Sequence, residues 1–214
     1  MSAPARARRP LPPGVHVLAD DDPRWPNDPV AQARAAVAAG AAVVQLRAKH
    51  ATDREALRLA AALRAITRQA GVLLVVNDRF DLALAAEADG VHLGQEDLPP
   101  ERLPAAARER LLVGRSTHTP EELARAAREP VDYVAFGPVF GTASKELSYA
   151  APGLAGLREA VAAAAPRPVV AIGGIGAAQA PAVAAAGAAG IAVISAVAAA
   201  PDPEAAAREL VRAF

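Results

Sequence analysis

The sequence predicts an α/β protein folded as a single (βα)8 TIM barrel. Short runs rich in Val, Ile and Leu alternate along the chain with longer Ala-, Leu- and Arg-rich segments of helical character. Several of the short runs are apolar throughout, as in parallel strands covered on both faces. A chain of 214 residues has the length of one such barrel.

Eight runs are expected to form the strands, and a helical segment follows each of them. In chain order they are Val15–Leu18, Ala42–Arg47, Leu73–Asn77, Gly90–Leu93, Leu111–Gly114, Tyr133–Phe136, Val169–Ile172 and Ile191–Ile194.

Signals at the helix ends support this division. Thr52-Asp53-Arg54-Glu55 has the pattern of a capping box, and Thr119-Pro120-Glu121-Glu122 adds a proline at the first helical position. Asp202-Pro203 is expected to open the last helix in the same way. Four glycines are expected where helices end: Gly40, Gly71, Gly90 and Gly187.

Two other folds are less consistent with the pattern. An open doubly wound sheet has a GxGxxG turn after its first strand, whereas this chain has Asp20-Asp21-Asp22-Pro23 there. A leucine-rich solenoid has a repeat of fixed length, whereas the units here differ in length and in loop chemistry.

Charge and cysteine content exclude several classes of function. Lys and Arg total 23 and so do Asp and Glu, which gives no general attraction to nucleic acid or to anionic membranes. An anionic ligand must therefore be held by local groups. The chain has no cysteine, which excludes disulfides, thiolate metal sites and thiol nucleophiles.

The composition of two segments bears on domain bounds and location. Residues 1–13 are basic and Pro-rich, and we expect a disordered arm before a catalytic barrel domain at residues 14–214. No apolar segment of the signal-peptide type follows the arm, so a cytoplasmic location is expected. The uncharged stretch between Arg167 and Asp202 is broken by Gly and Pro, which favours two buried strands around an Ala-rich helix over a membrane span.

The active site of such a barrel lies at the carboxyl ends of its strands. Only two lysines occur among the 23 basic residues, Lys49 and Lys145, and both follow expected strand ends. Because lysine is a compact point charge that arginine does not replace, this placement indicates a specific need. Asp78 and Asp97 follow adjacent strands, so their carboxylates can meet above the barrel and bind Mg2+. Asp78 as a helix cap is the alternative interpretation.

A second anion site is expected after the last two strands. Gly173-Gly174-Ile175-Gly176 lets backbone N–H groups approach a phosphate, and Ile194-Ser195 follows the neighbouring strand. Two anion sites on one rim predict two phosphorylated substrates.

The histidines leave alternatives open. His16 is expected to pack inside the first strand, and His92 points into the barrel with either a packing or a functional role. His118 follows the fifth strand and is a site candidate. With no cysteine and no convincing Ser-His-Asp arrangement, the sequence offers no candidate for covalent catalysis.

From about Val15 to its C-terminus the chain resembles the thiamine phosphate synthase family. Six signatures carry the resemblance, in the family's order: Gln45-Leu46-Arg47-Ala48-Lys49, Asn77-Asp78-Arg79, Gly90-Val91-His92-Leu93-Gly94-Gln95-Glu96-Asp97, Gly114-Arg115-Ser116-Thr117-His118-Thr119, Ala171-Ile172-Gly173-Gly174-Ile175 and Val193-Ile194-Ser195-Ala196.

The resemblance implies a transferase that joins a pyrimidine diphosphate to a thiazole phosphate with Mg2+ as cofactor. It implies small-molecule substrates, no nucleic-acid or membrane partner, and a chain able to form a homodimer. The metal ligands would be Asp78 and Asp97. The aminopyrimidine diphosphate would be held by Gln45, Leu46, Arg47, Ala48, Lys49, Asn77, Ser116 and Lys145.

Four of these residues, Arg47, Lys49, Ser116 and Lys145, would also serve catalysis. The thiazole phosphate would contact Thr142, Ala143, Ser144, Gly174, Ile194 and Ser195. The family's Phe-Pro-Thr-x-Thr-Lys loop reads Phe140-Gly141-Thr142-Ala143-Ser144-Lys145 here, a departure expected to affect thiazole affinity more than the reaction. A related thiazole tautomerase and a non-catalytic phosphate-binding barrel are the rival functions.

Overall fold

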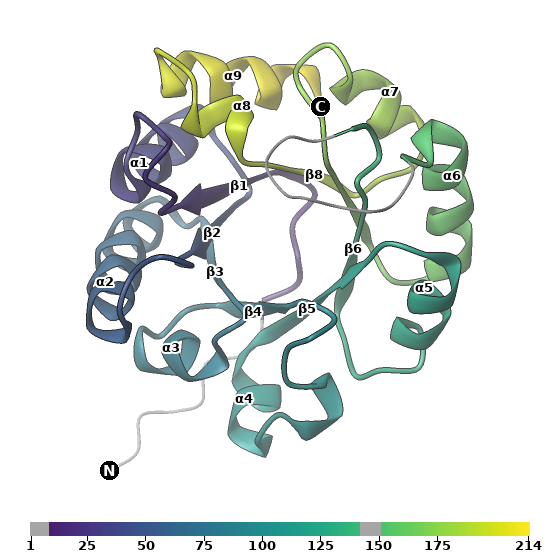
Figure 1. Ribbon diagram of the computed structural model, residues 1–214, viewed down its shortest axis with the longest axis horizontal. Coiled ribbons are helices and arrows are strands. Elements are labelled where there is room, and N and C mark those ends of the chain that lie inside the picture. Colours follow the sequence, from purple (N-terminus) through teal and green to yellow (C-terminus); the bar gives the residue numbers. More distant parts are fainter. Residues whose placement is uncertain (1–8, 142–150) are drawn as a thin grey trace.

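The computed structural model describes residues 9–141 and 151–214. Eight parallel strands close into a barrel in the order β1 to β8, and helices surround it (Figure 1). The strands are β1 (Gly14–Asp20), β2 (Val43–Arg47), β3 (Leu73–Asn77), β4 (Gly90–Leu93), β5 (Leu112–Thr117), β6 (Tyr133–Phe136), β7 (Val169–Ile172) and β8 (Gly190–Val193). The expected barrel is confirmed, and the rival folds are wrong.

A helical segment follows each strand along the chain, and the last two helices come after β8. They are α1 (Pro29–Ala39), α2 (Asp53–Ala70), α3 (Phe80–Ala85), the 3-10 turn η1 (Pro100–Arg102), α4 (Ala105–Arg110), α5 (Pro120–Ala126), α6 (Gly153–Ala164), α7 (Ala180–Ala185), α8 (Ser195–Ala198) and α9 (Pro203–Ala213). The carboxyl ends of all the strands meet at one rim, which is where the polar loops lie.

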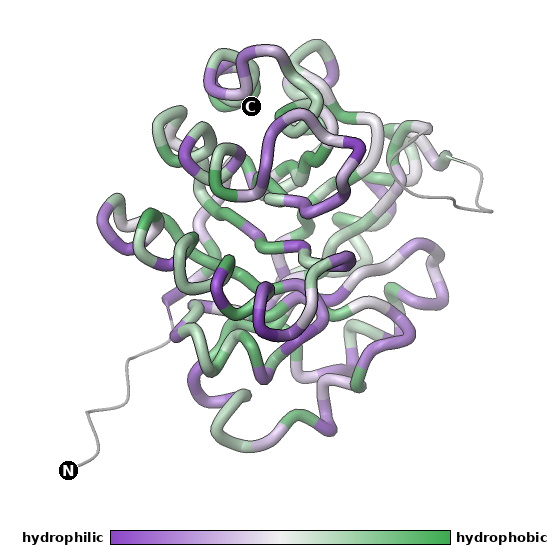
Figure 2. Tube along the Cα trace, turned by 60° about the vertical axis from the view of Figure 1, so that its left-hand side comes forward, coloured by the Kyte–Doolittle hydropathy of each residue, from purple (hydrophilic) through white to green (hydrophobic). Residues whose placement is uncertain are grey.

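Alternate residues of a strand face two separate cores. In β3, Leu73 and Val75 belong to one buried cluster and Leu74 and Val76 to the larger cluster under the helices. The tube in Figure 2 accordingly has its apolar segments along the strands and the inner sides of the helices. Many residues of the larger cluster are alanines, so that helices pack close to the sheet.

The capping signals are mostly confirmed. Thr52 and Glu55 form the complete capping box of α2. Thr119 accepts a hydrogen bond from the Glu122 backbone, but the Glu122 carboxylate binds the His118 N–H instead of closing the box. Gly40 and Gly71 end α1 and α2 in the left-handed conformation.

The remaining helix-end signals are Asp202, Gly187 and Gly90. Asp202 caps α9. Gly187 follows α7 with a φ of 93°. The expectation for Gly90 is wrong, because this glycine begins β4; a Cβ there would lie 2.8 Å from the Leu112 carbonyl oxygen.

The N-terminal arm is described only in part, and the uncharged stretch after Arg167 belongs to the barrel. Residues 1–8 of the expected arm lie outside the described residues, and residues 9–13 form no helix or strand. Arg9 donates a hydrogen bond to the Gly71 carbonyl, and Leu11 packs against buried strand residues. The uncharged stretch after Arg167 forms β7, α7, β8 and α8, and no described helix is long and apolar enough to cross a membrane.

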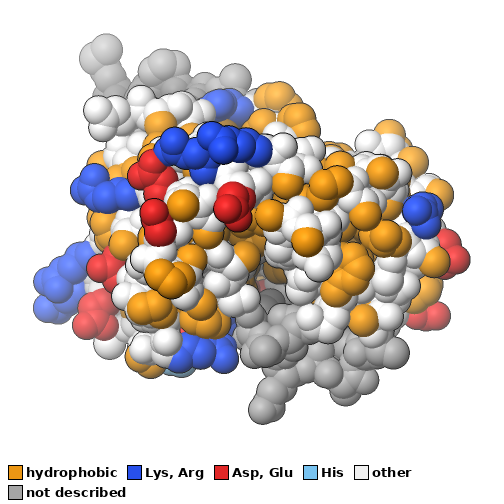
Figure 3. Space-filling model, turned by 90° about the horizontal axis from the view of Figure 1, so that it is seen from above, with side chains coloured by type: hydrophobic (Ala, Val, Ile, Leu, Met, Phe, Trp, Pro, Cys, Tyr) orange, Lys and Arg blue, Asp and Glu red, His pale blue; other side chains and the backbone are white. Residues whose placement is uncertain are grey.

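The outer surface carries charges of both signs. Figure 3 shows Lys and Arg side chains interspersed with Asp and Glu and with apolar residues. This distribution agrees with the zero net charge and shows no extended single-sign field on the visible face.

Candidate active site

The ends of β2, β3 and β4 bring a lysine and two aspartates together. Lys49 lies two residues beyond β2, and its ammonium forms an ion pair with the Asp78 carboxylate just after β3. Asp78 also shares a hydrogen bond with Asp97, which follows β4. The Gly94 N–H donates to Asp97 at 2.6 Å and fixes it from the other side. The three residues therefore meet at one point on the rim.

Local backbone structure directs Asp78 toward this point. Asp78 has a φ of 65°, in the left-handed region that is uncommon for residues other than glycine. Its N–H donates to the His92 carbonyl at 2.7 Å, which ties the end of β3 to β4. Arg79, rather than Asp78, is the N-cap residue of α3, and it makes no side-chain cap. The alternative interpretation of Asp78 as a helix cap is wrong.

The pair of carboxylates is electrostatically asymmetric. Burial raises the pKa of Asp97, and its hydrogen bond with Asp78 raises it further. Burial also acts to raise the pKa of Asp78, but hydrogen bonds with Asp97 and Lys49 and the charge of Lys49 outweigh it and lower that pKa. Of the two carboxyls, Asp78 is therefore the stronger acid and Asp97 the weaker one.

This arrangement fits a divalent cation. Oxygens of the two carboxylates already converge, so a cation between them would be held by the same atoms. Among the described residues no group of three or more His, Asp or Glu side chains is arranged to hold a metal ion. The remaining coordination positions would fall to substrate oxygens and water, which is how Mg2+ is commonly bound.

Arg47 ends β2 beside this cluster. Its guanidinium donates to the Asp20 carboxylate at 2.7 Å, and the arginine side chain is only 14% exposed. Asn77 ends β3 next to Asp78. Gln45 is buried and shares the interior face of β2 with Val43, whereas Leu46 packs in the cluster under the helices. Ala48 is partly buried against that same cluster.

A hydrogen-bonded chain runs from the barrel interior to the rim. Ser116 is the fifth residue of β5 rather than a loop residue, and its hydroxyl lies 2.9 Å from His92 Nε2. The other ring nitrogen of His92 lies 3.0 Å from the Tyr133 hydroxyl. Gly114 makes room for this pair, since a Cβ there would overlap both rings. His92 therefore points into the barrel, as expected, and connects Ser116 to the core.

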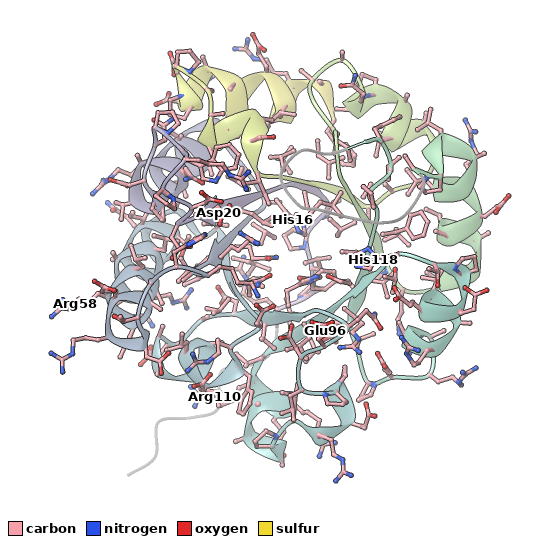
Figure 4. All side chains as sticks on the ribbon, viewed as in Figure 1. His16, Asp20, Arg58, Glu96, Arg110 and His118 are labelled. Carbon is pink, nitrogen blue, oxygen red and sulfur yellow. The ribbon has the colours of Figure 1, made fainter. Side chains whose placement is uncertain are left out.

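A pocket of about 320 Å3 opens at the ends of β5 to β8. Predicted site residues Gly174, Ile194 and Ser195 line it, and so does His118. The His118 ring hydrogen-bonds to the Gly137 carbonyl at 2.6 Å, and Figure 4 shows it at the β5–β6 side of the rim. The pocket is where the sequence predicts the second anion site.

Glycines shape the wall of this pocket. Gly174 has a φ of 65°, and a Cβ on it would overlap the Gly141 carbonyl oxygen. Gly173 has a φ of 100°, and a Cβ would lie 2.5 Å from Pro138 Cα. Only glycine allows this close approach of the loops after β6 and β7. Four predicted site residues of the β6 loop lie outside the described residues: Thr142, Ala143, Ser144 and Lys145.

Sequence reasoning missed two residues of the rim. Asp20 is 1% exposed and binds Arg47, and Trp25 donates its indole N–H to the same carboxylate at 2.9 Å. The available signal was an aspartate directly after an apolar run; its register with Arg47 on the neighbouring strand is a feature of the structure. His16 is a core residue, as expected, with 1% exposure.

With this geometry described, the comparisons with known proteins decide the family. A family model described as thiamine monophosphate synthase matches residues 15–197. The chain belongs to the thiamine monophosphate synthase family. The expected membership and the expected transferase class are thereby confirmed.

Relatives within the family are similar over most of their length. A protein of Anaeromyxobacter dehalogenans named thiamine-phosphate synthase is 51% identical over 187 residues, covering 87% of this chain and 83% of the relative. One of the same name from Chloroflexus aurantiacus is 50% identical over 179 residues, covering 82% and 81%. The solved thiamine phosphate pyrophosphorylase of Pyrococcus furiosus superposes with a TM-score of 0.82 at 39% identity, covering 95% of both chains.

Proposed function

We propose that this chain makes thiamine phosphate by joining an aminopyrimidine methyl diphosphate to a thiazole phosphate, with release of diphosphate. The observation that carries the proposal is the pairing on one rim of a cationic and carboxylate cluster with a separate glycine-walled pocket. The cluster of Lys49, Asp78 and Asp97 suits a diphosphate with its cation, and the pocket suits a phosphate. Family membership supports the same pair of substrates.

The proposed metal is Mg2+, held by Asp78 and Asp97. When bound, it would supply positive charge to the oxygens of the leaving diphosphate. Arg47 and Lys49 add fixed positive charge beside the same oxygens. Lys145, which lies outside the described residues, is proposed to do the same from the β6 loop.

The proposed reaction breaks the C–O bond between the pyrimidine methylene and the diphosphate. The bonding electrons leave with the diphosphate, and the electron-rich aminopyrimidine stabilises the carbocation that remains. The thiazole nitrogen then supplies the electron pair for the new C–N bond, so no protein nucleophile is needed. Ser116, tied to His92 and Tyr133, is proposed to orient the pyrimidine, while Gly174, Ile194 and Ser195 hold the thiazole phosphate.

Two rivals make different demands. A thiazole tautomerase has no diphosphate to bind and therefore no need for Asp78, Asp97 and Lys49 in contact. A non-catalytic phosphate-binding barrel would not need the positive charges that bind the leaving group either.

We further propose that the protein is cytoplasmic and forms a homodimer in solution.

The test is turnover of the purified protein with both substrates and Mg2+. The proposal predicts thiamine phosphate and diphosphate in equal amounts. Isomerisation of the thiazole without diphosphate release would replace the proposal with the tautomerase. Binding of the thiazole phosphate without conversion of either substrate would replace it with the phosphate-binding barrel.

A further inference from the structure

Three consecutive aspartates lie at the end of β1 and in the turn that follows it, and none of them belongs to the cation cluster described above. Asp20 is the last residue of β1, and its partner in the parallel ladder with β2 is Arg47. Figure 4 shows Asp20 at the end of β1 on the rim. A buried carboxylate in this position needs paired donors to offset its lost hydration.

Asp20 has those donors on both oxygens. Oδ1 accepts from Arg47 Nη1 at 2.7 Å and Oδ2 accepts from Trp25 Nε1 at 2.9 Å. The backbone of Asp20 is fixed as well, because the buried Gln32 side chain accepts from its N–H and donates to its carbonyl, both at 2.9 Å. Asp20 is therefore a rigid acceptor, and it fixes the orientation of the Arg47 guanidinium.

The Arg47 guanidinium keeps a donor that no described residue uses. Arg47 Nε is buried and has no hydrogen-bond partner among residues 9–141 and 151–214. A buried donor without a partner costs free energy unless a ligand satisfies it. Phosphate oxygens are suitable acceptors, because the planar fork of arginine matches them.

Asp21 acts on the backbone of the same loop. Its carboxylate accepts from the N–H groups of Lys49 at 2.8 Å, His50 at 3.0 Å and Ala51 at 2.7 Å. Three such bonds hold the segment from which the Lys49 side chain reaches Asp78. Adjacent aspartates thus fix the two cations by different routes, Asp20 through a side chain and Asp21 through the backbone.

We propose that Asp20 and Asp21 are positioning residues for the diphosphate end of the substrate, acting through Arg47 and Lys49. This inference rests on the proposed function. It adds that Asp20 and Asp21 determine the affinity for the diphosphate. The affinity for the thiazole phosphate does not depend on them, since the pocket at β5 to β8 has no residue from this part of the chain.

The experiment compares Asp20→Asn, Asp21→Ala and the wild-type protein in steady-state kinetics, with inorganic pyrophosphate as an inhibitory probe. We expect the KM for the pyrimidine diphosphate and the inhibition constant of pyrophosphate to rise about tenfold. The KM for the thiazole phosphate stays within about twofold of wild type. Asp22→Ala is the matched control, because Asp22 pairs with Arg24 and, among the described contacts, meets the β2 loop through the exposed His50 side chain at 3.8 Å and through none of its backbone N–H groups.

A double-mutant cycle separates positioning from general loss of structure. If Asp20 acts through Arg47, Asp20→Asn adds no further rise in the pyrophosphate inhibition constant once Arg47→Ala is present. Trp25→Phe removes one donor to Asp20 and is expected to give a smaller change of the same kind. It remains informative if Asp20→Asn does not fold.

Two results would overturn the inference: equal changes in the KM values of both substrates, or multiplicative effects of Asp20→Asn and Arg47→Ala. Failure of the proposed function looks different, because the wild-type protein itself would then not turn over.

Discussion

Lys49 and Asp78 form an ion pair across the ends of β2 and β3, although 29 positions separate them in the chain. Lys49 is one of two lysines in a chain that otherwise uses arginine, and the ion pair gives a reason for the choice. A compact ammonium can touch one carboxylate and leave its other N–H donors for a phosphate, whereas a guanidinium needs a wider planar approach.

Lys49→Arg is therefore expected to impair turnover although the charge is kept. We expect kcat/KM for the pyrimidine diphosphate to fall about tenfold, or about 1.4 kcal/mol of transition-state stabilisation. The matched control is Arg58→Lys, the reverse exchange on the outer face of α2, where Figure 4 shows Arg58 pointing away from the barrel. Unchanged kinetics in Lys49→Arg would contradict the assignment.

Ser116 and its neighbour Thr117 provide a second comparison within one strand. Ser116→Ala removes the hydroxyl bound to His92 and is expected to raise the KM for the pyrimidine diphosphate roughly tenfold. Thr117 instead donates to the Ala135 carbonyl at 2.9 Å, so Thr117→Val is expected to cost about 1 kcal/mol of unfolding free energy with KM unchanged. Kinetics and urea unfolding of both variants check the pair; a reversed pattern would remove Ser116 from the site.

Gly174 tests the pocket at β5 to β8. Gly174→Ala would overlap the Gly141 carbonyl oxygen, so we expect the KM for the thiazole phosphate to rise at least about tenfold. Gly71→Ala is the control, because Gly71 has a φ of 72° and nothing within 4 Å of a built Cβ. It should lose about 1 kcal/mol of stability from backbone strain and keep both KM values. Equal thiazole KM values in the two variants would exclude Gly174 from the binding site.

His16 should make stability depend on pH well away from the rim. Burial lowers its pKa from 6.5 to about 4. The unfolded chain then takes up a proton before the folded one does, so stability is complete above pH 6.5 and falls as the pH drops toward 4. The full loss is about 3 kcal/mol at most. Urea midpoints of wild type and His16→Gln across this window check it; parallel curves would refute a neutral buried His16.

The strands could be predicted from sequence because apolar residues predominate in most of them. β3, β4, β6 and β7 have the predicted bounds, since the residue that follows each of them is an aspartate or a glycine. β5 extends to Thr117, three residues past its expected end, because Arg115 and Ser116 have partners that polarity alone does not reveal. Arg115 binds the Gly94 carbonyl and pairs with Glu129 at 3.2 Å.

The site was predictable only in part, because contacts between distant residues depend on how the strands are aligned in the barrel. Asp78 and Asp97 follow adjacent strands, so topology alone brings them together. The contact of Tyr133 with His92 depends on barrel register and on Gly114, and it spans 41 positions. Asp20 was read as part of a turn because its pairing with Arg47 is visible only once β1 and β2 are in register.

Magnesium dependence is the sharpest test of a cation site at Asp78 and Asp97. The initial rate of thiamine phosphate formation would be measured against Mg2+ concentration, with EDTA as the zero point, for wild type, Asp78→Asn, Asp97→Asn and the exposed neighbour Glu96→Gln. We expect no wild-type product in EDTA, a rate loss of roughly 10²-fold in both aspartate variants even at high Mg2+, and a wild-type curve for Glu96→Gln. Full activity in EDTA, or wild-type Mg2+ curves for both aspartate variants, would contradict a cation-assisted diphosphate site at the ends of β3 and β4.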